Sequence, residues 1–297
     1  MQRTTQGDLF AVLCSLSVGV SITPAKLAIS VISPEALTFY LFVFAFAYSL
    51  VFLFNKDQRR IIFSIQKDQM LLIMQLAVLF SVAIFFSWTA LQYLEPVTQS
   101  FLSRIKILLT VLLAVIILKE KLLPLEITGG LVAASGLILL KFNAGSLVSK
   151  GATLMLLSAL LFAVAENMLK SKITDIPPAK FLFFRNFLMI PCFGIIALVR
   201  GQSFTIPDWT TTGWIALTSL LAPFFGRWLY ILAIRRNSLS RTVLINQTQP
   251  LFAALAGYVI LNSIPGLMEW LGGGLILAGA MIIRMARSNK KVKTAPS

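Results

Sequence analysis

Residues 99–118 read QSFLSRIKILLTVLLAVIIL, an apolar run long enough to cross a membrane as one helix. The run nevertheless carries Arg104 and Lys106, about a third of the way along it. A charge at that depth costs roughly 2.5–3.5 kcal/mol on insertion scales, which makes a lipid-facing position unfavourable. The usual compensation is a polar cavity inside a helix bundle, and we expect the rest of the chain to build one.

The composition is that of a membrane protein with many spans. Of the 297 residues 58% are hydrophobic and 12% are charged, where soluble domains carry roughly 25% charged residues. The net charge of +15 would also suit a nucleic-acid-binding protein, but the basic residues lie in short loops between apolar spans. We therefore expect the lipid bilayer as partner and no nucleic acid.

Cysteine and histidine usage excludes several kinds of site. Cys14 and Cys192, the two cysteines, both fall in apolar spans, so the sequence indicates no disulfide framework. Histidine is absent, which excludes catalysis or metal binding by imidazole. The sequence also has no Walker motif, no nucleophile elbow and no metal-ligand spacing. We expect no ATP-driven pumping by this chain alone, no cofactor, no metal and no enzymatic activity.

Proline, glycine and charged clusters divide the chain into ten apolar spans. The spans cover 9–29, 34–54, 70–93, 97–118, 122–142, 150–171, 178–199, 210–234, 241–261 and 266–286. The expected fold class is therefore an all-α membrane protein with ten transmembrane helices. Residues 288–297 form a polar cytoplasmic tail that we expect to be disordered.

The distribution of lysine and arginine predicts the orientation. With the N-terminus in the cytoplasm, 18 of the 26 basic residues fall on the cytoplasmic side and 4 on the other side. This bias places both chain ends in the cytoplasm. The remaining 4 lie within spans and are Arg104, Lys106, Arg185 and Arg227.

An internal repeat relates the two halves of the chain. With an offset of 143 residues, 99–106 aligns with 242–249 and 126–130 aligns with 269–273. Each repeat holds five spans, and because five is odd the second copy must enter the membrane from the opposite side. We expect inverted repeats over 1–146 and 147–287, with a substrate site near the midplane between them.

Polar residues share one face of the fourth span and one face of the ninth. At about 100° per residue, those of the fourth span lie within an arc of about 160°. We interpret the two arcs as facing walls of a central pathway, although polar residues also hold membrane helices together and Arg104 or Lys106 could snorkel to the outer interface. The candidate residues are Ser103, Arg104 and Lys106, and Asn246, Gln247 and Gln249.

Three further spans contribute candidates, each with two interpretations. Glu166 is the only acid well inside a span. It either pairs locally with Lys170 or serves as a counter-ion for an arginine or a substrate amine, or as a proton carrier. The aromatic and amide residues either clamp a flat or charged substrate or belong to an interfacial belt. These residues are Trp88 and Gln92 in the third span, and Arg227, Trp228 and Tyr230 in the eighth.

Four stretches carry a resemblance to a known family. They read WTALQYLEP (88–96), LKEKLLPLEITGGLVAASGLIL (118–139), QTQPLFAALAGYVIL (247–261) and EWLGGGLILAG (269–279). Together with the five-plus-five spans, the whole chain resembles the drug/metabolite transporter superfamily, and its EamA-type branch in particular. The family often has a mid-helix proline in both copies, whereas this chain has Pro250 opposite Ile107. It also has Ser263 opposite the acid Glu120, so we expect the halves to move unequally.

The resemblance implies a secondary transporter that moves a small metabolite, often an amino acid and often outward. Four intramembrane cations against one acid favour a cargo with a carboxylate or phosphate. We expect a bacterial inner-membrane exporter of an amino acid or organic anion that works by alternating access, as a monomer or homodimer. Arg104 or Lys106 would meet the carboxylate, which places it toward the first repeat. The alternatives are an uptake carrier or antiporter for a nucleotide-like metabolite, and a non-transporting scaffold subunit.

Overall fold

The computed structural model describes residues 2–106, 109, 113, 124–142, 146–170, 176–201, 207–236, 242, 245–262 and 266–293. Within these ranges all regular secondary structure is helical. Six segments are long and apolar enough to cross a membrane, namely 6–29, 34–54, 67–91, 150–169, 178–199 and 209–236. This confirms an all-α protein with several membrane spans, while the full count of ten stays a prediction.

The helices follow the predicted spans closely. The first half comprises α1 (Gln2–Ile29), α2 (Pro34–Ser49), η1 (Leu50–Phe54), α3 (Lys56–Phe63), α4 (Lys67–Leu91), α5 (Pro96–Leu102) and α7 (Pro124–Phe142). The second half comprises α8 (Ser146–Lys170), α9 (Pro178–Val199), α10 (Trp209–Ser219), η3 (Leu220–Gly226), α11 (Arg227–Arg236), η4 (Asn246–Thr248), α13 (Gln249–Leu261) and α14 (Leu267–Lys293). Most of the fourth span beyond Lys106 lies outside the described residues.

Proline sets the start of several helices. Pro34, Pro96 and Pro178 each occupy the first turn of α2, α5 and α9. Proline suits this position because its fixed φ is helical and the amide hydrogen it lacks would have no partner within the helix. At α2 the hydroxyl of Ser33 completes the start by accepting a hydrogen bond from the backbone N–H of Ala36 at 3.2 Å.

The eighth span is interrupted in its middle. Between α10 and α11 the seven residues of η3 form π-helical turns around Pro223, which cannot donate a backbone hydrogen bond. Ser17 of α1 donates to the carbonyl oxygen of Leu221 at 2.6 Å, so a neighbouring helix satisfies a carbonyl of the widened turns. A Cβ on Gly226 would lie 2.6 Å from Val18, which shows how closely α1 approaches. The interruption places Arg227 at the start of α11.

The two halves interlock rather than packing as separate bundles. α2 packs against α9, α4 against α8, α5 against α13 and α7 against α14, while α1 contacts α10, η3, α11 and α13. The α7–α14 contact is close enough that a Cβ on Gly136 would lie 2.5 Å from the carbonyl oxygen of Gly272. Each main pair therefore joins one half of the chain to the other.

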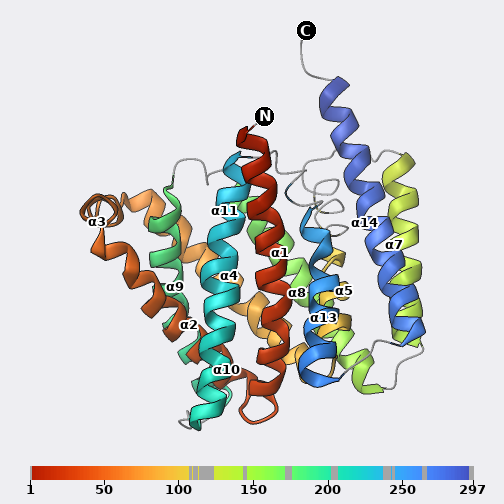
Figure 1. Cartoon of the computed structure of the whole chain (residues 1–297), viewed down its shortest axis with the longest axis horizontal. Coiled ribbons are helices and arrows are strands. Elements are labelled where there is room, and N and C mark those ends of the chain that lie inside the picture. Colours follow the sequence, from red (N-terminus) through yellow and green to blue (C-terminus); the bar gives the residue numbers. More distant parts are fainter. Residues whose placement is uncertain are drawn as a thin grey trace.

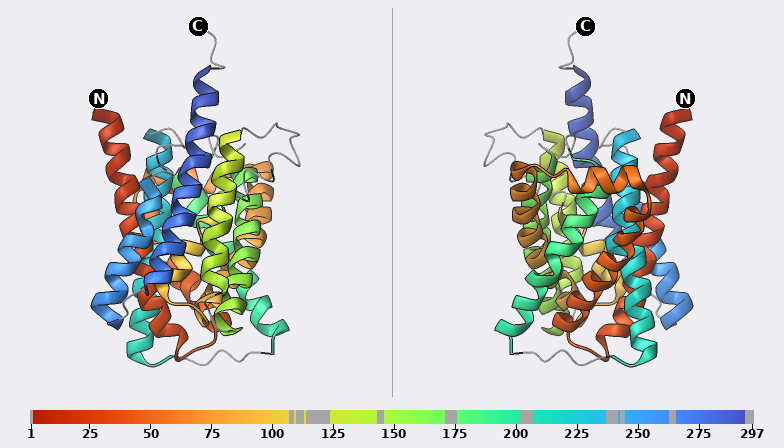
Figure 2. Two further views of the ribbon diagram at one scale, coloured as in Figure 1. Left: turned by 90° about the vertical axis from the view of Figure 1, so that its right-hand side faces the viewer. Right: turned by 90° about the vertical axis from the view of Figure 1, so that its left-hand side faces the viewer.

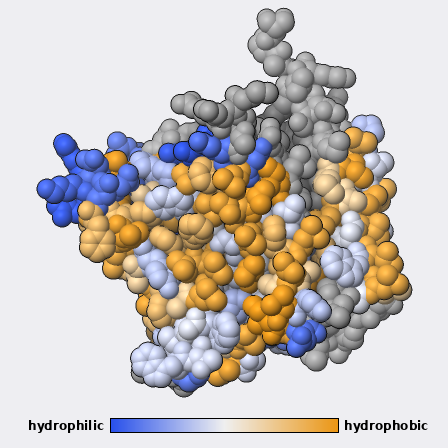
Figure 3. Space-filling model, in the orientation of Figure 1, coloured by the Kyte–Doolittle hydropathy of each residue, from blue (hydrophilic) through white to orange (hydrophobic). Residues whose placement is uncertain are grey.

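Corresponding helices of the two halves run in opposite directions. Figure 1 shows α1 descending from the end of the bundle where the chain begins, whereas α8 ascends toward that end. α7 and α14 likewise run antiparallel. The start of α1 and the end of α14 lie at the same end of the bundle. Figure 3 shows apolar residues over the sides of the bundle and a hydrophilic group at one edge of it.

α3 is an additional helix that the sequence analysis did not anticipate in the loop 55–69. Asn55 caps it by accepting hydrogen bonds from the backbone N–H groups of Asp57 and Gln58. α3 lies across the direction of the bundle at its edge, seen end-on in Figure 1 and side-on in Figure 2. It packs against α9 and η1, and Ile62 on the packed face is fully buried.

Candidate functional site

Five charged side chains from four segments of the chain meet inside the bundle, and we call them the central charged cluster. They are Arg104 and Lys106 from the segment that follows α5, Glu166 from α8, Arg185 from α9 and Arg227 from α11. The cluster contains the four cations and the one acid that the sequence analysis placed within spans. The interactions inside it decide which charges are balanced by protein groups.

Lys106 and Glu166 form a direct ion pair. Nζ of Lys106 lies 2.8 Å from Oε1 of Glu166, and the side chains are 31% and 26% exposed. The ammonium group also lies 5.7 Å from the ring centroid of Phe162. Glu166 interacts electrostatically with Arg227 and Arg104 as well. The salt-bridge partner is therefore a lysine of the first half, whereas the Lys170 side chain lies outside the described residues.

Arg104 bridges the two halves of the chain. Its Nη1 donates to the carbonyl oxygen of Asn246 at 3.0 Å, and its Nη2 donates to Oε1 of Gln249 at 2.6 Å. On its own side it donates to Oγ of Ser103 from Nη2 at 2.8 Å and to the carbonyl oxygen of Ser100 from Nε at 3.3 Å. The structure thus brings Ser103, Arg104, Asn246 and Gln249 together, and protein acceptors engage this guanidinium group.

α1 adds polar groups that the sequence analysis did not select. Ser15 donates to Oδ1 of Asn246 at 3.1 Å and to the carbonyl oxygen of Ile245 at 3.3 Å. The neighbouring Cys14 is buried and within electrostatic range of Arg227 and Arg104. A small polar residue is a weak signal in a transmembrane sequence, because serine and cysteine occur at many helix contacts. The hydrogen bonds of Ser15 to Ile245 and Asn246 become visible only from the packing of α1 against η4.

Arg185 and Arg227 flank one aromatic ring. The guanidinium carbon of Arg227 lies 5.1 Å from the ring centroid of Phe80 and 5.4 Å from that of Tyr230. The guanidinium carbon of Arg185 lies 5.6 Å from Phe80 and 5.3 Å from Phe42. Such contacts favour a cation, but they leave its N–H groups without acceptors.

The hydrogen bonding of these two arginines is incomplete. Arg185 is 4% exposed and donates from Nη1 to Oδ1 of Asn186 at 3.1 Å. Its Nε, together with Nε and Nη2 of Arg227, is buried with no hydrogen-bond acceptor among the described residues. The two positive charges also interact with each other. A buried arginine beside a partly exposed one, with three buried donors unsatisfied between them, makes a site that an anion would stabilise.

The remaining predicted residues lie around or away from this cluster. Trp88 is half-buried and packs against the main apolar core. Trp228 stacks on Phe52, with ring centroids 4.3 Å apart, and so contributes to packing. Gln92 follows the last residue of α4 and its side chain is exposed. The side chain of Gln247 lies outside the described residues.

The comparisons with known proteins agree with the fold and the repeat. The EamA-like transporter family matches the chain twice, over residues 5–142 and 149–285. No curated protein matches the sequence. Twenty-eight chains of solved structures are similar. One of them, a crystal structure without a functional name, is 19% identical, with a TM-score of 0.60 over 95% of this chain and 98% of its own length. That likeness shows the fold, and the double family match shows that the chain belongs to the EamA-like transporter family.

Proposed function

We propose that this transporter is a secondary carrier for a small organic anion and that Arg227 and Arg185 hold the anionic group. The observation that carries the proposal is the incomplete hydrogen bonding of these two arginines around Phe80. Burial without a partner is costly for a charged group, so a carboxylate or phosphate that supplied acceptors would be bound favourably. An amino acid or another carboxylate-bearing metabolite has the required group.

Arg104 and Lys106 take supporting roles in this proposal. Arg104 already donates to acceptors of both halves, and Lys106 already pairs with Glu166. A cargo carboxylate at either residue would first have to displace a protein acceptor. At Arg227 no such displacement is needed for Nε and Nη2. The anion is therefore placed closer to the second half than the sequence analysis expected.

Glu166 is proposed as the coupling group. Its carboxylate interacts with Lys106, Arg227 and Arg104. An incoming anion competes with the Glu166 carboxylate for the field of these cations, and a proton on Glu166 would relieve that competition. Cargo binding and protonation of Glu166 would then favour each other, which is the linkage that proton-coupled transport requires.

Alternating access is proposed to arise from two inverted five-helix units. The opposite directions of α1 and α8, and of α7 and α14, support this arrangement. The lysine and arginine bias supports an orientation with both chain ends in the cytoplasm. A bacterial inner membrane and export as the direction of transport are proposed from the family resemblance alone. The contact of Arg104 with Asn246 and Gln249 would have to change as the halves rock.

The test is transport and binding by the full chain. Purified protein is first screened by thermal shift against amino acids, organic acids and nucleotides, and stabilising compounds are then assayed for transport in proteoliposomes. We expect Arg227→Gln to weaken cargo binding by at least tenfold, because a charged hydrogen bond contributes about 1.5–3 kcal/mol. Arg236→Gln removes an exposed charge from the same helix and is the matched control. Equal cargo affinity in wild type and Arg227→Gln would refute the assignment.

A nucleotide-like cargo is the second candidate. The aromatic rings of Phe80 and Tyr230 beside two arginines would suit a flat base next to a phosphate. Stabilisation by nucleotides but not by amino acids in the same screen would favour this cargo. A scaffold without transport activity predicts that no compound is carried, although the protein remains folded.

A further inference from the structure

The exposed and packed faces of α3 differ in charge. At about 100° per residue, Lys56, Arg59, Arg60 and Phe63 fall on one side of this helix, and all four are exposed. Ile62 lies on the opposite side and is fully buried. Because the packed face is apolar and the free face is basic, α3 presents its cations away from the bundle.

A buried lysine fixes α3 at its C-terminal end. Nζ of Lys180, at the start of α9, donates to the carbonyl oxygen of Ser64 at 2.9 Å and to Oε1 of Gln69 at 3.3 Å. These bonds tie both ends of the short connection between α3 and α4 to α9. The basic face therefore has a fixed position relative to the membrane-spanning helices.

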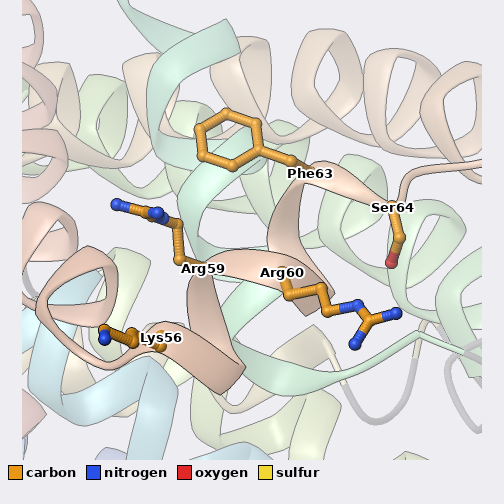
Figure 4. Close-up of a pocket in the computed structure, with 5 residues that line it drawn as sticks. All are labelled: Lys56, Arg59, Arg60, Phe63 and Ser64. Carbon is orange, nitrogen blue, oxygen red and sulfur yellow. The ribbon is translucent and has the colours of Figure 1, made fainter.

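The free face of α3 borders a pocket with a net positive lining. The pocket has a volume of about 520 Å³ and is lined by Lys56, Arg59, Arg60, Phe63 and Ser64, with no carboxylate (Figure 4). Figure 4 shows the Lys56 and Arg59 side chains on one side and the Arg60 side chain pointing the other way. The salt bridges found among the described residues, Lys106–Glu166 and Arg200–Glu35, involve none of these three cations.

Large apolar side chains lie next to this basic group. Phe54 at the end of η1 is 88% exposed, Val51 one turn earlier is 54% exposed and Phe63 is 63% exposed. Figure 3 shows the hydrophilic group at the edge of the bundle, directly beside the apolar sides. In a membrane this edge is the level where phospholipid headgroups meet the acyl chains. A free phosphate would use the cations only, whereas a phospholipid would also contact the apolar side chains.

We infer that this pocket binds the phosphate of an anionic phospholipid, with Lys56, Arg59 and Arg60 around the headgroup and Val51, Phe54 and Phe63 against the acyl chains. The charge complementarity and the apolar border select this occupant. A site of this kind fixes α3 at the membrane surface. Since α3 packs on α9, bound lipid would also bias the helix that carries Arg185.

The test is lipid binding by the full-length protein in neutral detergent, measured by native mass spectrometry. Phosphatidylglycerol should bind in preference to phosphatidylcholine. Each basic residue near an anionic lipid surface contributes about 1 kcal/mol, so Arg59→Gln and Arg60→Gln should each weaken phosphatidylglycerol binding about fivefold. Lys67→Gln is the matched control, because Lys67 is an exposed cation at the start of α4, close in sequence to α3 but outside the pocket lining.

Three outcomes would overturn the inference. The first is equal retention of phosphatidylglycerol and phosphatidylcholine. The second is an equal loss of binding in Lys67→Gln and Arg59→Gln, which would show a general charge effect instead of a site. The third is displacement of phosphatidylglycerol by inorganic phosphate at similar concentration, which would show a site for free phosphate. All three variants replace exposed side chains, so the fold should be retained and can be checked by thermal unfolding.

Discussion

Substitutions at the two ends of the Lys106–Glu166 ion pair should differ in their effect on stability. Removing one partner of a fully buried pair costs about 3–5 kcal/mol, because the other charge is left uncompensated. Both side chains are partly exposed, at 31% and 26%, so solvent screening lowers this to about 2–3 kcal/mol for Glu166→Gln. That variant leaves four cations with no acid. In Lys106→Gln the carboxylate still interacts with Arg227 and Arg104, and we expect a cost of about 1 kcal/mol.

Thermal unfolding can measure this difference. At about 2 °C per kcal/mol for a chain of this length, Glu166→Gln should lower Tm by about 5 °C and Lys106→Gln by about 2 °C. Cys14 is 5% exposed, so a thiol-reactive fluorophore reports unfolding when this thiol becomes accessible. The measurement is made in a Cys192→Ala background, because Cys192 is less deeply buried.

Equal Tm shifts in the two variants would contradict this expectation, since the remaining arginines would then contribute nothing to the stability of the Glu166 carboxylate. A larger shift for Lys106→Gln would refute it more strongly. The double variant Lys106→Gln/Glu166→Gln is informative as well. It should be destabilised less than Glu166→Gln alone, because Lys106 no longer remains as an uncompensated charge, although the three arginines still lack the Glu166 carboxylate.

Two other predictions concern positions outside the cluster. Gly226→Val should destabilise the protein by about 1–3 kcal/mol through overpacking, because a Cβ there would lie 2.6 Å from Val18, whereas Gly213→Val meets no atom within 4 Å; thermal unfolding compares the two. At the start of α10, hydrogen bonds from Thr211 lower the pKa of Asp208. The stabilisation from its carboxylate is thus complete above the ordinary pKa of about 3.9 and is lost as the pH falls through the lower folded pKa. Asp208→Asn should reduce this acid dependence of Tm, and an unchanged dependence would contradict the cap.

The positions of the spans could be predicted where proline and charge mark their ends. Spans at 34–54 and 178–199 agree with α2 plus η1 and with α9, because Pro34 and Pro178 are favoured in the first turn of a helix. α3 was missed because residues 55–69 are mainly polar, although Asn55 followed by basic residues and then Ile61 and Ile62 has the pattern of a capped amphipathic helix. The π-helical turns at Pro223 could not be predicted from the local sequence, because one of their carbonyl groups, that of Leu221, accepts a hydrogen bond from Ser17 of another helix, α1.

The composition of the central cluster could be predicted, but its pairing could not. Each intramembrane charge is visible in the sequence because a charged residue interrupts an apolar run. Which charges meet depends on the register between helices that are far apart in the chain. The Lys106–Glu166 pair joins residues 60 positions apart, and the bond from Arg104 to Gln249 joins residues 145 positions apart. Helical periodicity gives the face of each helix but not the height at which two faces meet.

The contacts of Arg104 and Lys106 change the interpretation of the charge asymmetry between the repeats, which the sequence alone favoured as a sign of a cargo carboxylate near the first repeat. In the alignment at 143 residues, Arg104 corresponds to Gln247 and Lys106 to Gln249, so the first copy carries cations where the second carries amides. Arg104 donates to the side-chain oxygen of Gln249, so at this amide the asymmetry is a match of donor with acceptor across the repeat interface, and it also donates to the backbone carbonyl of Asn246. Protein groups thus already accept hydrogen bonds from Arg104, and Lys106 is already paired with Glu166. Under the proposed function, the donors that remain for a cargo are those of Arg185 and Arg227 in the second repeat, and selectivity for an anion should follow these two residues.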